Sequence, residues 1–416
     1  MSIYQLKDVF KSGQFPEYTY YNRPDIKMET KIEDYIEFEE GKCLTIYGPS
    51  KAGKTVAVQK MLPENYAIWI SGGSFNSIDQ FYHMISDRLD LYAEITTSNT
   101  KKHSLSTSIG IQSLFRFALK NDNENSSSKK QTKLNISQVK DKLSEKPVPL
   151  VIDDFHFINE NLQKEISLQI KDLIRLTNVI LISIPETSFA PLKNIPDMNW
   201  RTVDMPIKNW SVNELTEIAT KGFRLLNIED PDKKISLELA THSYGAPIIM
   251  QDLCKRYTRQ NLRLRETSPT PLVAIPVPDW NKFFQEIALS NKPAIFEKLA
   301  SGKNTRGKKR VLIEFNDSSK MDIYISILKT IKNMDEINIS QKIDKKILST
   351  KLNEMIKSQK NTQQISACLN HLNDIAQTNR GDSDPALIYS DPYLTILDPS
   401  LVYYIRHADW EEQLLS

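Results

Sequence analysis

The feature that most constrains the fold is the segment "GPSKAGKT", in which Gly48 and Gly53 are followed by Lys54 and Thr55. An apolar stretch, "CLTIY", precedes this segment, and a helix-like run, "KTVAVQKML", follows it. A glycine-rich turn between a strand and a helix gathers backbone N–H groups and directs the positive end of the helix dipole toward an anion. The pattern therefore predicts a strand–loop–helix unit that binds phosphate groups.

Each residue type in this loop has a defined task in phosphate binding. We expect loop N–H groups to contact phosphate oxygens, Lys54 to reach the β- and γ-phosphates, and the Thr55 hydroxyl to bind Mg²⁺. A surface turn that matches the pattern by accident is the alternative, and the flanking strand and helix argue against it. The predicted nucleotide-binding residues of the loop are Gly48, Pro49, Ser50, Lys51, Ala52, Gly53, Lys54, Thr55 and Val56.

A second apolar strand, "PLVIDD", ends in two carboxylates, Asp153 and Asp154. In P-loop ATPases, a strand-end aspartate holds the Mg²⁺ ion, and the next carboxylate orients or deprotonates the attacking water. We therefore predict Asp153 as a metal ligand beside Thr55, Asp154 as a catalytic residue, and ATP with Mg²⁺ as cofactors. A pair of aspartates that caps a helix has the same appearance in sequence. The combination of the pair with the phosphate loop favours the catalytic interpretation.

The chain changes near residue 207 from alternating strand-like and helix-like segments to helix-like segments alone. Such alternation indicates an α/β domain, in which helices flank both faces of a parallel sheet. We predict an α/β domain at 1–207 with a Ser- and Asn-rich insertion at about 96–138, a helical subdomain at 208–262, a linker with a short helix at 263–305, and a C-terminal domain at 306–416.

The composition limits the cellular setting and the kinds of partner. The net charge is only +2 over 416 residues, so the chain as a whole is not strongly basic. Any nucleic-acid contact therefore has to come from a local basic patch. The three cysteines are far apart and form neither a disulfide framework nor a zinc motif. Apolar runs stay well below the ~20 residues of a membrane span, so we expect a soluble, cytoplasmic protein with no membrane partner.

The order of the phosphate loop, "VIDDFHFI", a helical segment and "YGAPIIMQDL" resembles the STAND-type ATPases (signal-transduction ATPases with numerous domains) of the AAA-related P-loop superclass. The resemblance covers roughly residues 15–260. It implies an AAA+/STAND-like P-loop NTPase sheet followed by a helical lid at 208–262. It also implies that Pro247 packs near the nucleotide base and that "TYYNRPDIKME" helps to enclose the adenine.

The same resemblance suggests further residues near the γ-phosphate. Ser183 ends the strand "VILIS" and is a candidate sensor, with a plain strand-end serine as the alternative. Many relatives carry an arginine just after this strand, whereas "SIPETSF" has none. Arg175 and Arg201 are the available candidates for that arginine, and ordinary surface arginines have the same appearance. An arginine of a neighbouring subunit is a further possibility.

The C-terminal domain resembles the winged helix-turn-helix domains of prokaryotic AAA-related ATPases, with three helices, a hairpin and a closing helix. Helix "TQQISACLNHLNDIAQ" takes the recognition position, where polar side chains can contact bases or phosphates. The basic loop at 303–310 could grip phosphates or stay solvated. DNA binding and a protein-docking or autoinhibitory role are both open for this domain, because fold does not give function.

Three functional hypotheses follow. The first is a regulated ATPase switch in bacterial defence or stress signalling, acting by self-association or through a separate effector protein. The second is an AAA+ loader or transposition-type adaptor that assembles on DNA with ATP. The third is a nucleotide-binding scaffold with negligible turnover. DNA-stimulated ATP hydrolysis, hydrolysis without DNA, and binding without phosphate release separate the three.

Overall fold

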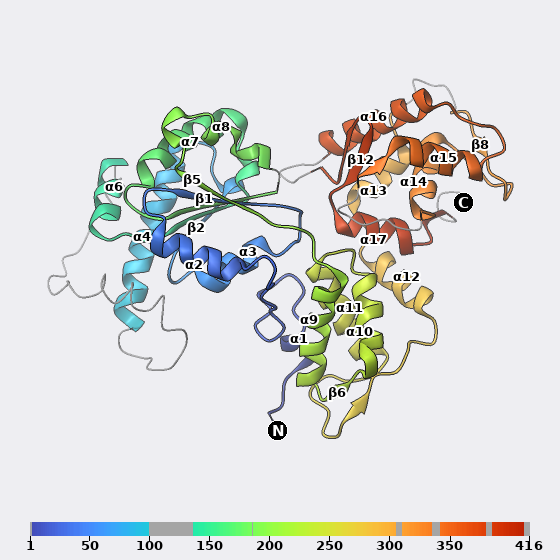
Figure 1. The fold of residues 1–416 in the computed structure, drawn as a ribbon, viewed down its shortest axis with the longest axis horizontal. Helices are drawn as coiled ribbons and strands as arrows, with labels where there is room; N and C mark the ends of the chain where they lie inside the picture. Colours follow the sequence, from blue (N-terminus) through green and yellow to red (C-terminus); the bar gives the residue numbers. More distant parts are fainter. Residues whose placement is uncertain are drawn as a thin grey trace. The chain divides into compact units, whose positions relative to one another are not determined.

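The computed structural model describes residues 2–99, 136–184, 186–304, 310–334, 342–379 and 385–411. Most of the predicted insertion at 96–138 lies outside these residues. The contacts divide the chain into two compact units, each of which is coloured along the sequence in Figure 1. Unit 1 comprises Met1–Tyr21, Pro49–Ala52 and Lys208–Ser416, and unit 2 comprises Asn22–Gly48 and Gly53–Ile207. The four predicted segments remain a finer division that these contacts do not test.

Unit 2 is built on a parallel sheet, as the alternating pattern predicts. Within its described residues, five strands pair in the order β2-β3-β4-β1-β5, and all of the pairs are parallel. The central strands are apolar on both faces because helices cover both faces. The strands are β1 (Cys43–Tyr47), β2 (Ile68–Ser71), β3 (Leu150–Asp153), β4 (Val179–Ser183) and β5 (Thr202–Pro206).

Helices cover both faces of this sheet. In Figure 1, α2 and α3 lie on one side of it, and α7 and α8 lie on the other. The main core of unit 2 joins β2, β3 and β4 to the apolar faces of α4, α6 and α7. The helices are α2 (Met28–Phe38), α3 (Lys54–Met61), α4 (Ile78–Asn99), α6 (Ile136–Glu145), α7 (Glu160–Leu173) and α8 (Ala190–Lys193).

The first part of unit 1 is a helical subdomain. Helix α9 starts at a capping box in which Ser211 and Glu214 satisfy each other's backbone N–H groups. The residues at 263–305, predicted as a linker with a short helix, hold β7 and two helices. The apolar faces of these helices, including Phe284 and Phe296, are buried in the core. The elements are α1 (Leu6–Val9), α9 (Val212–Leu225), β6 (Ile228–Glu229), α10 (Lys234–Thr241), α11 (Pro247–Gln260), β7 (Leu272–Val273), α12 (Trp280–Ser290) and α13 (Ala294–Ser301).

The described residues of the C-terminal part of unit 1 form three helices, a hairpin and a closing helix, together with three shorter strands. Strands β10, β12 and β11 pair in that order, and β11 and β12 form the hairpin. The elements are β8 (Ile313–Glu314), β9 (Lys320–Met321), α14 (Ile323–Lys332), β10 (Ile343–Asp344), α15 (Lys345–Met355), α16 (Thr362–Thr378), β11 (Leu387–Ser390), β12 (Tyr393–Ile396) and α17 (Pro399–His407).

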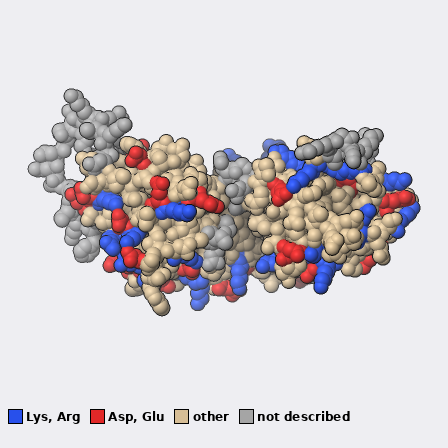
Figure 2. All heavy atoms as spheres, turned by 90° about the horizontal axis from the view of Figure 1, so that it is seen from above, with Lys and Arg blue, Asp and Glu red and all other residues tan. Residues whose placement is uncertain are grey.

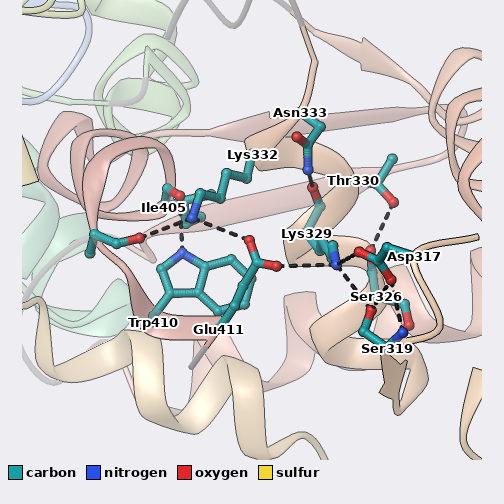
Figure 3. Close-up of polar contacts among 11 residues, drawn as sticks. Asp317, Ser319, Ser326, Lys329, Thr330, Lys332, Asn333, Ile405, Trp410 and Glu411 are labelled. Carbon is teal, nitrogen blue, oxygen red and sulfur yellow. Dashed lines mark hydrogen bonds and ion pairs between the residues drawn. The ribbon is translucent and has the colours of Figure 1, made fainter. Parts of the chain in front are cut away.

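A network of lysines and carboxylates holds Trp410 and Glu411 against α14 (Figure 3). Lys329, which is buried, lies 2.9 Å from a carboxylate oxygen of Asp317 and 3.2 Å from one of Glu411. Lys332 bonds the other Glu411 oxygen at 3.2 Å and lies over the ring of Trp410, which is fully buried. We call these five residues the C-terminal clasp. Because its charges are paired, the clasp can bury an ammonium group without leaving it uncompensated.

Candidate functional site

The loop after β1 begins at a glycine that no other residue can replace without strain. Gly48 has a φ of 152°, and a Cβ atom there would lie 2.2 Å from the carbonyl oxygen of Ile207. The backbone is held in this position because the Gly48 N–H donates to Ile184 and the Ile207 N–H donates to Tyr47. The close approach of two backbone segments therefore requires a glycine at the start of the loop.

The loop ends at the first turn of α3. Gly53 is the N-cap residue of this helix and adopts a φ of 87°, a left-handed conformation that suits glycine. Lys54 follows in the first turn, is largely buried, and donates a hydrogen bond from Nζ to the carbonyl oxygen of Gly48 at 3.0 Å. The lysine side chain thus spans the loop from one glycine to the other. This geometry brings an ammonium group and a helix N-terminus to the same turn.

The strand-end aspartates lie beside this turn. The Thr55 hydroxyl forms a hydrogen bond with the Asp153 carboxylate, and a carboxylate oxygen of Asp153 accepts the N–H of Asp154 at 2.9 Å. Burial raises the pKa of Asp153, and the bonds from Thr55 and Asp154 offset part of that rise. The structure therefore brings Lys54 and Thr55 close to the two aspartates, although the aspartates come about a hundred residues later in the sequence.

Asp154 has an unusual backbone and an unusual acidity. Its φ of 54° places a non-glycine residue in the left-handed region. A Cβ atom at Gly72 would lie 2.3 Å from the Asp154 carbonyl oxygen, so this glycine makes room for the turn. Burial, followed by the charge of Asp153, raises the pKa of Asp154 to about 6. Sequence reasoning missed Gly72, and the "GG" pair after strand β2 was the available signal.

The donor set fits a magnesium ion that shares its ligands with phosphates. Among the described residues, no group of three or more His, Cys, Asp or Glu side chains could hold a metal ion. Mg²⁺ typically uses one or two carboxylates together with substrate phosphates and water. Thr55 and Asp153 supply one hydroxyl and one carboxylate, and hydrogen bonding between them offsets part of the rise that burial causes in the pKa of Asp153; this pair would be the protein part of such a site. The half-buried Asp153 carboxylate would gain a compensating charge from the ion.

The three predicted γ-phosphate sensors lie at opposite ends of the strands: Ser183 at a carboxyl end, and Arg175 and Arg201 before amino ends. Ser183 ends β4, is buried, and pairs in register with Tyr47, the residue just before the loop. Arg201 precedes β5, and its carbonyl oxygen accepts the N–H of Cys43 at the start of β1. Arg175 lies between the end of α7 and the start of β4. A strand of five residues is ~16 Å long, so the structure does not bring either arginine to the loop within this chain.

Unit 1 holds the middle of the loop and the predicted base contact. Pro247 is the first residue of α11 and follows Gly245, whose φ is 73°. The Lys51 ammonium lies 2.6 Å from a carboxylate oxygen of Asp398 and 2.6 Å from the hydroxyl of Ser400, at the start of α17. Lys51 is therefore ion-paired in this structure, which the sequence did not suggest.

Comparisons with known proteins find similar folds at low identity. No protein-family model matches the chain, and no curated protein matches its sequence. The Aeropyrum pernix ORC2 protein is 11% identical with a TM-score of 0.45, over 100% of both chains. Cdc6p from Pyrobaculum aerophilum is 11% identical with a TM-score of 0.42, over 99% of this chain and 100% of its own.

A STAND protein with a tetratricopeptide repeat sensor from Pyrococcus horikoshii is also similar. It is 13% identical with a TM-score of 0.37, and the match covers 95% of this chain and 44% of that protein. At these identities the likeness concerns the fold. The described strand order, the glycine loop that opens α3 and the aspartates that end β3 together make a parallel α/β sheet with a strand–loop–helix unit of the phosphate-binding kind.

Proposed function

We propose that this protein is a magnesium-dependent ATPase that acts as a molecular switch. The observation that carries the proposal is the loop that Lys54 spans from Gly53 to Gly48, beside Asp153, whose pKa is raised by burial and lowered in part by hydrogen bonding to the Thr55 hydroxyl. A structural helix cap would explain a strand-end aspartate. It would not explain why a half-buried carboxylate lies beside a hydroxyl from the first turn of a helix that begins with a glycine-rich phosphate loop.

The residues of the loop and the two aspartates would have separate roles in phosphoryl transfer. Loop N–H groups and the Lys54 ammonium would bind the phosphates, and Thr55 with Asp153 would hold Mg²⁺. The ion, when bound, would neutralise charge on the phosphate oxygens. Asp154 would orient the attacking water and accept its proton, for which a pKa of about 6 is well placed near neutral pH. Ser183 remains a candidate sensor, and Arg175 and Arg201 remain candidates only for a site completed by a second subunit.

The output of the switch is the C-terminal part of unit 1. Lys51 of the loop pairs with Asp398 and Ser400 at the first turn of α17, so the loop and this part are linked through one side chain. A nucleotide phosphate that attracts Lys51 would compete with Asp398 for the same ammonium group. The STAND resemblance suggests a regulatory ATPase of bacterial defence or stress signalling, which acts through self-association or a separate effector protein.

A DNA-dependent loader is the second candidate, and the surface of the C-terminal part favours it less. Helix α16 exposes Thr362, Gln363, Gln364 and Asn370, and its described exposed residues include no Lys or Arg. In the basic loop at 303–310, Lys303 pairs with Asp374 and Arg310 pairs with Asp322.

Residues 305–309 of that loop lie outside the described part of the chain. On the face drawn in Figure 2, basic and acidic side chains are interspersed. Among the described helices, none is long and apolar enough to cross a membrane.

The test is phosphate release from MgATP by the full chain, measured with and without duplex DNA over a range of salt concentrations. Turnover without DNA supports the switch. Turnover that needs DNA and falls steeply with salt supports the loader. Tight ATP binding without any phosphate release would refute the ATPase and leave a nucleotide-binding scaffold. Sizing the protein with and without ATP would show whether it self-associates.

A further inference from the structure

Trp210 connects the sheet domain to the helical subdomain and has no role in the proposal above. It follows β5 by four residues and directly precedes Ser211, the N-cap of α9. The capping box between Ser211 and Glu214 fixes the backbone at this point. A large apolar residue before an N-cap commonly packs on the first turns of the helix, and Trp210 packs against the core that contains Leu215. The capping box and the core therefore fix the position of the Trp210 indole.

The indole of Trp210 bonds the phosphate loop directly. Its Nε1–H donates to the carbonyl oxygen of Ala52 at 2.8 Å, across 158 positions of sequence. Ala52 is almost fully buried. In a trans peptide the C=O and the following N–H point in opposite directions, so the Gly53 N–H points away from Trp210. Holding the Ala52 carbonyl thus sets the direction of an N–H group that the loop offers to phosphates.

The other side of Trp210 faces the turn between α10 and α11. Its backbone N–H donates to the Gly245 carbonyl oxygen at 3.4 Å, two residues before Pro247. A Cβ atom at Gly245 would lie 3.4 Å from the Trp210 carbonyl oxygen, so the turn and Trp210 are in close contact. The ring of Tyr21 lies 6.3 Å from the Trp210 ring, and the Lys221 ammonium lies 5.1 Å from the Tyr21 ring.

We propose that Trp210 is a positioning residue for the bound nucleotide, acting through the peptide between Ala52 and Gly53. The inference rests on the proposed function, since it assumes that the loop binds phosphates. The loop contacts the part of the nucleotide that ATP and ADP share. Loss of the indole N–H should therefore weaken the binding of both nucleotides by about two- to tenfold, the range for one neutral hydrogen bond. Turnover at saturating ATP should change little, so that KM rises while kcat stays.

The first experiment compares Trp210→Phe with Trp280→Phe. Both variants remove one indole, but Trp280 stacks on Phe284 in α12, with ring centroids 5.4 Å apart, and has no part in the loop. MgADP binding is measured by calorimetry and MgATP turnover by phosphate release, with melting temperatures as the check on folding. We expect weaker MgADP binding and a raised KM for Trp210→Phe alone.

The second experiment uses the wild-type sequence labelled with 5-fluorotryptophan, which gives one fluorine resonance for each of the five tryptophans. The resonances are assigned from single Trp→Phe variants. MgADP should shift the Trp210 resonance. The resonance of Trp410, a clasp residue whose indole N–H donates to the Ile405 carbonyl oxygen, should stay unchanged. This measurement stands even if Trp210→Phe is unstable.

The outcomes separate this inference from the function on which it rests. If the wild-type protein binds no MgADP, the proposed function and the inference both fail. If it binds MgADP, but Trp210→Phe binds equally well or the Trp210 resonance stays in place, the inference alone is overturned. A lower kcat with an unchanged KM would also overturn it, because that pattern belongs to a group acting only in the transition state.

Discussion

Replacing Asp154 with asparagine should make the nucleotide-free protein more stable at neutral and alkaline pH. Burial and the charge of Asp153 raise the pKa of Asp154 from 3.8 to about 6. The ionised form of Asp154 therefore lowers the free energy of unfolding. Asparagine removes the charge, has nearly the same shape, and tolerates the left-handed φ of 54° at this position. A residue that is retained against stability is typical of a functional site.

The size of this effect follows from the pKa. One pKa unit corresponds to about 1.4 kcal/mol, so a rise from 3.8 to about 6 is worth about 3 kcal/mol for a fully shielded group. Asp154 is only partly buried, and solvent screening reduces the expected gain to about 1–2 kcal/mol. The sign is set by the raised pKa, because the folded state binds this proton more tightly than the unfolded state. The wild-type penalty is therefore full above pH 6 and disappears as pH falls toward 4.

Urea unfolding of wild type and Asp154→Asn at pH 8 and at pH 4 measures this difference. We expect the variant to be more stable at pH 8 and the two proteins to be nearly equal at pH 4. Phosphate release from MgATP should fall by at least about 100-fold in the variant, the usual range for a lost general base. A variant that is less stable at pH 8, or a difference that is the same at both pH values, would refute the reasoning. Unchanged turnover would remove Asp154 from the catalytic role.

Four further predictions test the loop, the metal and the C-terminal clasp. Lys54→Ala should weaken MgATP binding by about 10- to 100-fold in calorimetry, because a charge-assisted bond to phosphate is lost. Gly48→Ala should lower the free energy of unfolding by about 1–3 kcal/mol in urea, since its Cβ would meet the Ile207 carbonyl at 2.2 Å. Removing Mg²⁺ with EDTA should stop phosphate release, and adding back excess Mg²⁺ should restore it. Glu411→Gln should destabilise the protein by about 1–2 kcal/mol, because Lys329 and Lys332 lose a shared carboxylate, whereas Glu160→Gln, at the exposed start of α7, should not.

The strand–loop–helix unit could be predicted from sequence because its determinants are local. Gly48 and Gly53 stand at the two ends of the loop, and an apolar strand and a helix flank them within a few residues. The contact between Thr55 and Asp153 is long-range, yet it was predictable because parallel strands place their carboxyl ends at one edge. The direction of each strand was enough for this prediction, and no knowledge of side-chain packing was needed.

The same rule concerns the positions of the two candidate arginines. Arg175 and Arg201 both precede their strands, so a parallel sheet puts them at the opposite edge. The sequence prediction assigned them from resemblance and did not use the strand direction.

Contacts between distant elements were decided by the tertiary structure alone. Nothing near Trp210 or Ala52 indicates that they meet, and nothing near Lys51 indicates its pairing with Asp398. The pairing of Arg310 with Asp322 was likewise not indicated by the basic loop, for which phosphate contact and a solvated state were both open. Periodicity and turn residues act over a few positions and therefore determine the elements. The partner of an individual side chain depends on how those elements pack, which no short stretch of sequence records.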